Sequence, residues 1–246
     1  MNLLLSELLN HADPEQVNVL SWFFKTGPGQ YGEGDRFLGI KVPIVRKVVG
    51  QTWLKVGFQE LDECLASEYH EVRLGGLLAL VKIFSHPAKY LRHYSLDVST
   101  DELKKVCVDF YLSHTDRINN WDLVDLSCYP LLGEWLLERD RSILYKLAAD
   151  GKTIWEQRIG IVSTMTFIRH GQIKDTFAIA DILLHHSHDL IHKAVGWLLR
   201  EAGKRDKEAL VGYLKPRYRS MPRTMLRYAI EKLPEAERLD FLHGNV

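Results

Sequence analysis

The chain lacks the features that mark secreted, membrane and metal-binding proteins. Its 246 residues include three cysteines, Cys64, Cys107 and Cys128, without a CxxC or other metal-ligand spacing. Such an odd, scattered set is typical of reduced thiols in a cytosolic-type compartment. No apolar run approaches the roughly 18 residues of a membrane-spanning helix, and the opening MNLLLSELLN has no basic segment typical of a signal peptide. We therefore expect a cytoplasmic protein without a membrane partner.

An excess of charge of either sign is also absent. The chain has 32 Lys and Arg residues against 32 Asp and Glu residues, so its formal net charge is zero and by itself predicts no polyanionic partner. Hydrophobic residues make up 46% of the chain, which is ample for a sizeable core. A chain of this length can form one large domain or two small ones.

Strand signals are scarce, whereas helix start and stop signals recur. Asp13 and Pro14 form a typical N-cap and first helical residue, with Gly27 as the expected end of that helix. Ser99 and Glu102 have the spacing of a capping box. Further helices are expected to end at Gly50, Gly151, Gly171 and Gly203.

A weak internal repeat places a glycine in each of three helical segments. EVRLGGLLAL, EQRIGIVSTM and HKAVGWLLRE align on Gly75, Gly160 and Gly196, and the last two glycines are 36 residues apart. Because a mid-helix glycine costs about 1 kcal/mol relative to alanine, three in one register indicate close helix packing. The pattern predicts an all-α superhelical solenoid of stacked antiparallel helix pairs, similar to HEAT repeats. Chance similarity between amphipathic helices is the alternative.

Basic charge is concentrated near the C-terminal end. Residues 200–228 contain nine basic and three acidic residues, a local excess of six positive charges, with three tyrosines interleaved. A basic stripe with aromatic residues is typical of a surface that binds a nucleic-acid backbone. A solvated helix face is the ordinary alternative.

Three helical segments contain candidate site residues. In RINNWDLVDLS, Trp121 and Asp125 are four residues apart and so share a helix face. Trp197 and Arg200 are three apart on another predicted helix, and Arg158 lies on a third. Taken singly, each has an ordinary explanation as core, cap or surface ion pair. Together on successive helices they could converge on one concave surface.

Most of the sequence resembles the AlkD-type DNA alkylation repair glycosylases, which are HEAT-like proteins. The resemblance lies in the segments FLGIKVPIVRK (37–47), NNWDLVD (119–125), WEQRIGI (155–161) and HKAVGWLLREAGK (192–204). It implies a single solenoid domain over residues 1–246 with a basic groove. It also implies excision of N3-alkyladenine and N7-alkylguanine from duplex DNA, without metal, cofactor or base-flipping pocket.

The resemblance also assigns roles residue by residue. The family's catalytic aspartate matches Asp125, and its two lesion-facing tryptophans match Trp121 and Trp197. The two arginines that contact the DNA backbone match Arg158 and Arg200. A carboxylate suits this reaction, because a cationic base departs as a neutral molecule and leaves positive charge on the sugar.

Other assignments stay more open. Lys204 and Tyr31 are expected to contact DNA, and the aromatic wall near the lesion is Phe23, Phe24 or Tyr31. The glycine-rich segment TGPGQYGEG, which contains Tyr31, is expected to be a mobile loop and lacks the Gly-Lys-Ser/Thr of a phosphate-binding loop. We expect a monomer at the nucleoid. The alternatives are a non-catalytic HEAT-repeat protein that binds damaged or branched DNA, and a protein-binding HEAT scaffold.

Two groups of polar residues are assigned to structure. Asn119, Asn120 and Asp122 are expected to cap the start of the helix that carries Trp121. His188 and His192 have the spacing of a metal pair, but no third ligand is evident, and Ser187 or Asp189 is expected to cap that helix.

Overall fold

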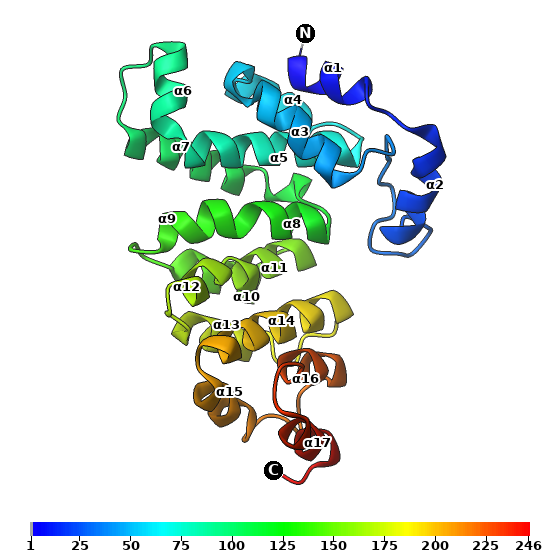
Figure 1. The fold of residues 1–246 in the computed structure, drawn as a ribbon, viewed down its shortest axis with the longest axis vertical. Coiled ribbons are helices and arrows are strands. Elements are labelled where there is room, and N and C mark those ends of the chain that lie inside the picture. Colours follow the sequence, from blue (N-terminus) through cyan, green and yellow to red (C-terminus); the bar gives the residue numbers. More distant parts are fainter. Residues whose placement is uncertain (1) are drawn as a thin grey trace. The chain divides into compact units, whose positions relative to one another are not determined.

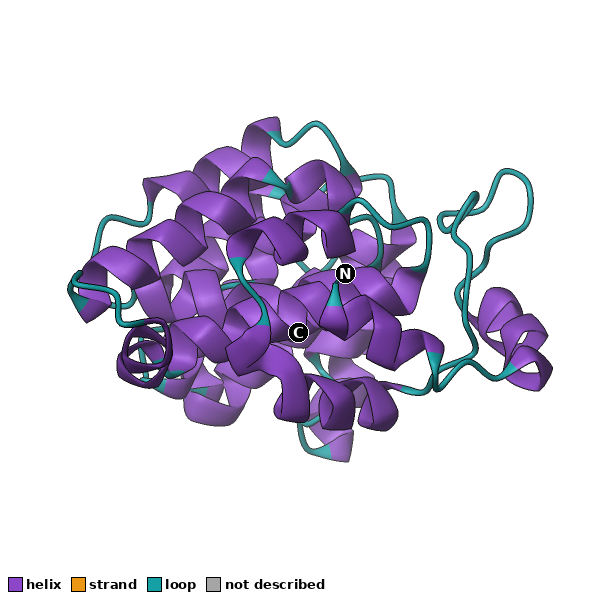
Figure 2. Cartoon of the chain, turned by 90° about the horizontal axis from the view of Figure 1, so that it is seen from above, coloured by secondary structure: helices purple, strands orange, loops and turns teal. Residues whose placement is uncertain are grey.

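The computed structural model describes residues 2–246, and in this range it confirms the predicted all-α class (Figure 2). The described residues form helices and loops without a β-strand, and one isolated bridge joins Arg36 to Tyr69. None of the described helices combines the length and hydropathy needed to cross a membrane.

The chain forms two compact units, an N-terminal unit that ends at Ser127 and a C-terminal unit that runs from Cys128 to Val246. Both consist of packed helices, and the single domain over residues 1–246 stays a prediction. The N-terminal unit contains α1 (Leu3–Leu9), α2 (Pro14–Phe23), α3 (Val42–Thr52), η1 (Trp53–Lys55), α4 (Phe58–Leu65), α5 (His70–Ser85), α6 (Pro87–Tyr94), α7 (Thr100–Ser113), η2 (Thr115–Arg117) and most of α8 (Trp121–Cys128). The C-terminal unit contains η3 (Tyr129–Gly133), α9 (Glu134–Leu136), α10 (Ser142–Asp150), α11 (Ile154–Val162), α12 (Met165–Arg169), α13 (Lys174–Ile182), α14 (Asp189–Arg205), α15 (Lys207–Leu214), α16 (Arg223–Ala229) and α17 (Glu235–His243).

Helix α5 is the core of the N-terminal unit. It packs against α3, α4 and α7 (Figure 1), and its side chains are buried nearly all round. A helix that is apolar on every side has to be enclosed by others, which explains its position. Helix α2, at the edge of this unit, buries none of its residues and exposes Val19, Trp22 and Phe23.

Helix α14 organises the C-terminal unit by packing against α11, α15 and α16. The contact with α16 is close because Gly196 has no side chain: a Cβ there would lie 2.5 Å from the carbonyl oxygen of Met225. At Gly160 a Cβ would lie 2.8 Å from the carbonyl oxygen of Leu144, where α11 meets α10. The prediction that the repeated glycines mark close helix packing is confirmed.

The predicted caps are confirmed at two helix starts and at Gly151, which follows the last residue of α10. They are wrong at four other positions, one of which is Gly50, because α3 continues past it to Thr52. Asp13 accepts a hydrogen bond from the Glu15 amide, and Ser99 and Glu102 form a capping box. Helix α2 ends at Phe23, well before Gly27. Helix α14 continues past Gly203, because that glycine packs against Leu210 of α15 rather than ending the helix. Its N-cap is His188, whose side chain accepts from the Leu190 amide, and neither Ser187 nor Asp189.

Candidate functional site

The first two turns of α8 present Trp121 and Asp125 on the partly exposed side of the helix. The Asn120 side-chain oxygen accepts a hydrogen bond from the Trp121 amide at 2.8 Å and so begins the helix. Leu123 and Val124 are 0% exposed and anchor the opposite side in the core. Trp121 and Asp125 are intermediate in burial, so each is held by the scaffold and is still open to solvent.

Aromatic rings from the end of α2 pack against Trp121. Phe24 is 6% exposed and stacks on Trp121 with 5.5 Å between ring centroids, and it also stacks on Phe37. Phe23 is 51% exposed and meets Trp121 edge-on at 6.0 Å. Tyr31 lies partly buried in the loop that follows. Among the three candidates for the aromatic wall, Phe24 belongs to the core and Phe23 stands beside Trp121 at the surface.

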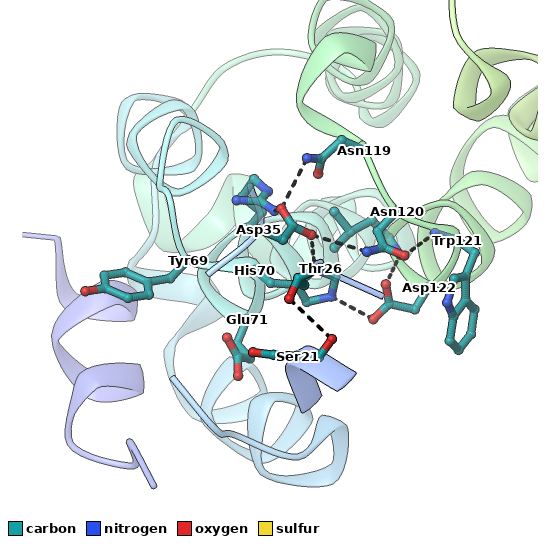
Figure 3. Close-up of polar contacts among 12 residues, drawn as sticks. Ser21, Thr26, Asp35, Tyr69, His70, Glu71, Asn119, Asn120, Trp121 and Asp122 are labelled. Carbon is teal, nitrogen blue, oxygen red and sulfur yellow. Dashed lines mark hydrogen bonds and ion pairs between the residues drawn. The ribbon is translucent and has the colours of Figure 1, made fainter. Parts of the chain in front are cut away.

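A buried polar cluster lies next to α8 (Figure 3). The His70 ring is 2.9 Å from an Asp122 carboxylate oxygen through Nε2, and 3.1 Å from Asp35 through Nδ1. Arg73, one turn along α5, pairs with the other oxygen of Asp35. We define these four residues as the His70 cluster, and all four are at most 9% exposed. No local pattern pointed to it, because its members are spread over almost 90 residues.

The expected capping role is therefore confirmed for Asn120 and incomplete for its neighbours. Asp122 accepts a hydrogen bond from the Leu123 amide at 2.9 Å, but its second oxygen pairs with His70. The amide groups of Asn119 and Asn120 each donate to Asp35 at 3.2 Å. The prediction is corrected for two residues. Asn119 donates to buried Asp35, and Asp122 pairs with buried His70, both of which are distant in the sequence.

Opposing effects set the protonation of the His70 cluster. Burial lowers the pKa of His70, but the charges and hydrogen bonds of Asp122 and Asp35 outweigh it and raise the pKa to about 9. Burial alone would raise the pKa of Asp35, yet the hydrogen bond from His70 and the charge of Arg73 lower it below its usual value. The cluster is thus a set of two cations and two carboxylates near neutral pH.

The stability of the N-terminal unit should fall in alkaline solution. Because the pKa of His70 is about 9 in the folded state against an ordinary 6.5, its contribution is complete below pH 6.5 and is lost as pH rises through 9. We expect a loss of roughly 3 kcal/mol in the free energy of unfolding over that range. Urea denaturation at stepped pH measures it. His70→Gln should remove this component, and His114→Gln, at an exposed ion pair with Asp62, should retain it.

Glu71, beside His70, organises the FLGI segment that the sequence singled out. Its buried carboxylate accepts hydrogen bonds from the backbone amides of Leu38, Gly39 and Ile40 at 2.9–3.0 Å. Gly39 has a φ of 86°, and a Cβ there would lie 1.9 Å from the Asp13 carbonyl oxygen. The segment therefore needs both this glycine and a buried acceptor on α5.

The second group of predicted site residues lies on α14 in the C-terminal unit. Trp197 and Arg200 are both partly buried, one turn apart. Arg200 pairs with Glu231 through its guanidinium and lies 3.5 Å from Glu201. Lys204 pairs with Glu201 at 2.7 Å. Carboxylates thus already hold these two cations in place.

A small pocket of about 90 Å³ collects positive charge between α14 and α15 and beyond the end of α16. Four of its lining residues are cations: Arg200, Lys204, Lys207 and Lys232. Gly203 also lines this basic pocket. Sequence reasoning missed Lys232, because the basic segment was counted only to residue 228. Each of these cations is paired with a glutamate: Arg200 and Lys232 with Glu231, Lys204 with Glu201, and Lys207 with Glu237. A phosphate oxygen in this pocket would therefore compete with these carboxylates.

Arg158 is buried at 6% exposure, and its guanidinium donates to the Leu190 carbonyl oxygen at 2.6 Å. That bond ties α11 to the first turn of α14. Direct contact of Arg158 with DNA stays a prediction.

The rest of the basic segment carries less net positive charge in the structure than its sequence suggests. Arg217 pairs with Asp181, and Lys207 pairs with Glu237, both acids from outside the segment. Tyr213 and Tyr218 are buried at 7% and 5% exposure. The predicted excess of six charges is therefore partly neutralised by other helices.

The histidines at the start of α14 make local bonds. His188 caps the helix, and His192 Nε2 contacts the His186 carbonyl oxygen. Within residues 2–246, no group of three His, Cys, Asp or Glu side chains is placed to hold a metal ion.

Comparison with known families decides what kind of protein carries these features. Residues 4–233 match the family described as DNA alkylation repair enzyme. The chain belongs to that family. Its role is therefore in the repair of alkylated DNA, with DNA as partner. A search of curated proteins found no significant match.

This DNA alkylation repair family member also has a solved structural relative. A predicted DNA alkylation repair enzyme from Enterococcus faecalis superposes with a TM-score of 0.67 and 14% sequence identity, covering 91% of this chain and 97% of the relative. At that identity the likeness shows the fold, a helical solenoid.

Proposed function

We propose that this family member is a monofunctional, AlkD-type DNA glycosylase that hydrolyses the N-glycosidic bond of N3-alkyladenine and N7-alkylguanine in duplex DNA. The observation that carries the proposal is the arrangement of Trp121 and Asp125 at the start of α8. Asp125 stands one turn from Trp121, both partly exposed, on a helix anchored by fully buried Leu123 and Val124. A carboxylate and an aromatic face held rigidly at a surface suit a cationic sugar and base.

The chemistry requires little else from the protein. The positively charged purine is already a good leaving group, because it departs as a neutral base. Asp125 would stabilise the charge that develops on the deoxyribose and orient the attacking water. No metal or cofactor is needed for these steps.

DNA contacts are assigned to residues in both units. Trp121, Phe23 and Trp197 would contact the lesion nucleotide through their rings, which attract a cationic base by roughly 0.5–2 kcal/mol. Contacts to the phosphates are proposed for the remaining predicted DNA-binding residues: Arg158, Arg200, Lys204 and Tyr31. We propose that the lesion is reached from the backbone side, without an enclosing pocket for a flipped base. Such an enzyme would work at the nucleoid as a monomer.

A base-release assay tests this function. The protein is incubated with a duplex that contains a single N7-methylguanine, and the free base is measured by chromatography. An undamaged duplex of the same sequence is the control. Release of 7-methylguanine is expected, and a wild-type protein that binds the duplex but releases no base would overturn the proposal.

A second candidate is a non-catalytic protein that binds damaged or branched DNA. The basic pocket favours it, since phosphate contacts at Arg200 and Lys204 do not depend on Asp125. Binding to branched DNA in preference to N7-methylguanine duplex, without base release, would support this candidate.

Arg200→Ala should weaken DNA binding at low salt by roughly tenfold, as expected for one charge-assisted phosphate contact. The plot of log affinity against log salt should become shallower by about one unit. Fluorescence anisotropy with a labelled duplex over a salt series measures both effects. Arg238→Ala is a matched control, because that arginine is partly exposed on α17 and does not line the basic pocket. An unchanged salt slope would remove Arg200 from the phosphate contacts.

A further inference from the structure

His70 stands between two carboxylates and is shielded from solvent. It is 1% exposed, with Asp122 on one ring nitrogen and Asp35 on the other. A carboxylate without its proton can only accept hydrogen bonds, so both ring nitrogens have to donate. With both carboxylates ionised, the geometry fits a doubly protonated ring, and Arg73 supplies the second positive charge of the cluster.

Two routes connect this ring to the start of α8, and Figure 3 shows the first of them. The first is the hydrogen bond to Asp122, the residue directly after Trp121, whose other oxygen accepts from the Leu123 amide. The second is a stack of rings. The imidazole lies 4.8 Å from the ring of Phe24, and Phe24 lies 5.5 Å from Trp121. Both the backbone and the indole at the candidate site are thus in contact with groups that His70 holds.

We propose that His70 is a positioning residue, which fixes Trp121 and Asp125 by joining α5 and the loop before α3 to the first turn of α8. The expected effect of His70 on the rate of base release rests on the proposed glycosylase function. Its expected effect on the position of Trp121 does not. Loss of the ring proton would break the bond to one carboxylate and leave the cluster with excess negative charge.

Among the groups that face or adjoin the ring, the two carboxylates favour its protonated form and outweigh the burial that opposes it. Asp35 comes from the loop before α3, and Asp122 from α8. On α5 itself, Arg73 is engaged by Asp35, and the Glu71 carboxylate is held by three backbone amides. Apart from these charges, the ring meets apolar surface, with Phe37 stacked 4.7 Å away and Phe24 nearby. The ring should therefore keep its proton at neutral pH and lose it in alkaline solution.

The kinetic test compares His70→Gln with wild type. A glutamine amide can donate to a carboxylate but carries no charge. We expect single-turnover release of 7-methylguanine to fall by roughly tenfold or more, because small misplacements of reacting groups are costly. Affinity for undamaged duplex should change by less than about twofold, since no phosphate contact is lost. In wild type, release should decline above pH 9, the region in which His70 titrates.

The matched control is His114→Gln. His114 also binds a carboxylate, Asp62, at 2.9 Å, but its side chain is 20% exposed and follows α7. This variant should release base at the wild-type rate and keep the wild-type pH profile. A His70→Gln variant that is folded and as active as His114→Gln would overturn the positioning role.

A second readout does not depend on activity. The indole N–H signal of Trp121, assigned by its absence in Trp121→Phe, should shift in a nitrogen-15 spectrum as wild type is titrated through pH 9. It should also be displaced in His70→Gln but not in His114→Gln. If wild type releases no base, the proposed function fails, and this titration alone decides the positioning role. A neutral His70 ring at pH 7, or a Trp121 signal insensitive to the titration, would overturn it even if His70→Gln does not fold.

Discussion

Asp125→Asn should lower the rate of 7-methylguanine release from duplex DNA by roughly 100- to 1,000-fold, the usual effect of removing one group that stabilises transition-state charge. In free energy this is roughly 3–4 kcal/mol, since each factor of ten corresponds to about 1.4 kcal/mol. The substitution keeps the size of the side chain and removes its negative charge. A neutral amide cannot stabilise a cationic sugar to the same degree.

The measurement is a single-turnover assay with enzyme in excess over a duplex that contains one N7-methylguanine. Anisotropy with undamaged duplex, run in parallel, should show unchanged affinity, because no phosphate contact is assigned to Asp125. Asp116→Asn is the matched control. It lies just before α8, its side chain is 71% exposed, and its substitution should leave the rate unchanged. Release that survives Asp125→Asn would spare the activity and refute the assigned role.

Gly196→Ala should destabilise the C-terminal unit by roughly 2–3 kcal/mol, the cost of forcing extra volume into a close-packed contact. The added Cβ would lie 2.5 Å from the Met225 carbonyl oxygen and 2.5 Å from the Tyr228 Cβ, so α14 and α16 would have to separate. Neither neighbour is the flexible end of a long side chain. The free energy of unfolding from urea denaturation measures the effect.

Gly212→Ala provides a control with the opposite sign. Gly212 lies on the exposed side of α15, and a Cβ there meets no atom within 4 Å. Alanine is the better helix former, so this variant should gain up to about 1 kcal/mol.

The repeat glycines should also differ from one another. A Cβ at Gly160 meets backbone at 2.8 Å, whereas at Gly75 it meets only the ends of the Leu8 and Leu4 side chains. We expect losses in the order Gly196, Gly160, Gly75, and equal losses would contradict the packing argument.

Much of the candidate site was visible in local sequence. The four-residue spacing of Trp121 and Asp125 placed them on one face of a helix, and the structure presents both at the partly exposed side of α8. The repeated glycines predicted close helix contacts for the same reason: helix geometry fixes which neighbours share a face. Local hydrogen bonds such as the Ser99 and Glu102 capping box are equally readable. The role of the protein came from the match to a family, because the spacing of residues does not by itself indicate function.

Other features depended on pairings that no window of sequence displays. Phe23 and Phe24 are adjacent and chemically identical, and only the position of Phe37 and His70 decides which of the two is buried. His70 and Asp122 are 52 residues apart, yet they form the contact that supports the site.

The sequence by itself determined the helical class, several helix boundaries and the face shared by Trp121 and Asp125, because these follow from hydrogen bonds and side-chain spacing within a few turns. Only the tertiary structure decided the His70 cluster, the exposed position of Phe23 and the neutralisation of the basic segment by Glu231 and Asp181. The physical reason is that burial and ion pairing depend on which distant segments pack together. That choice reflects the balance of apolar burial and desolvation over a whole unit.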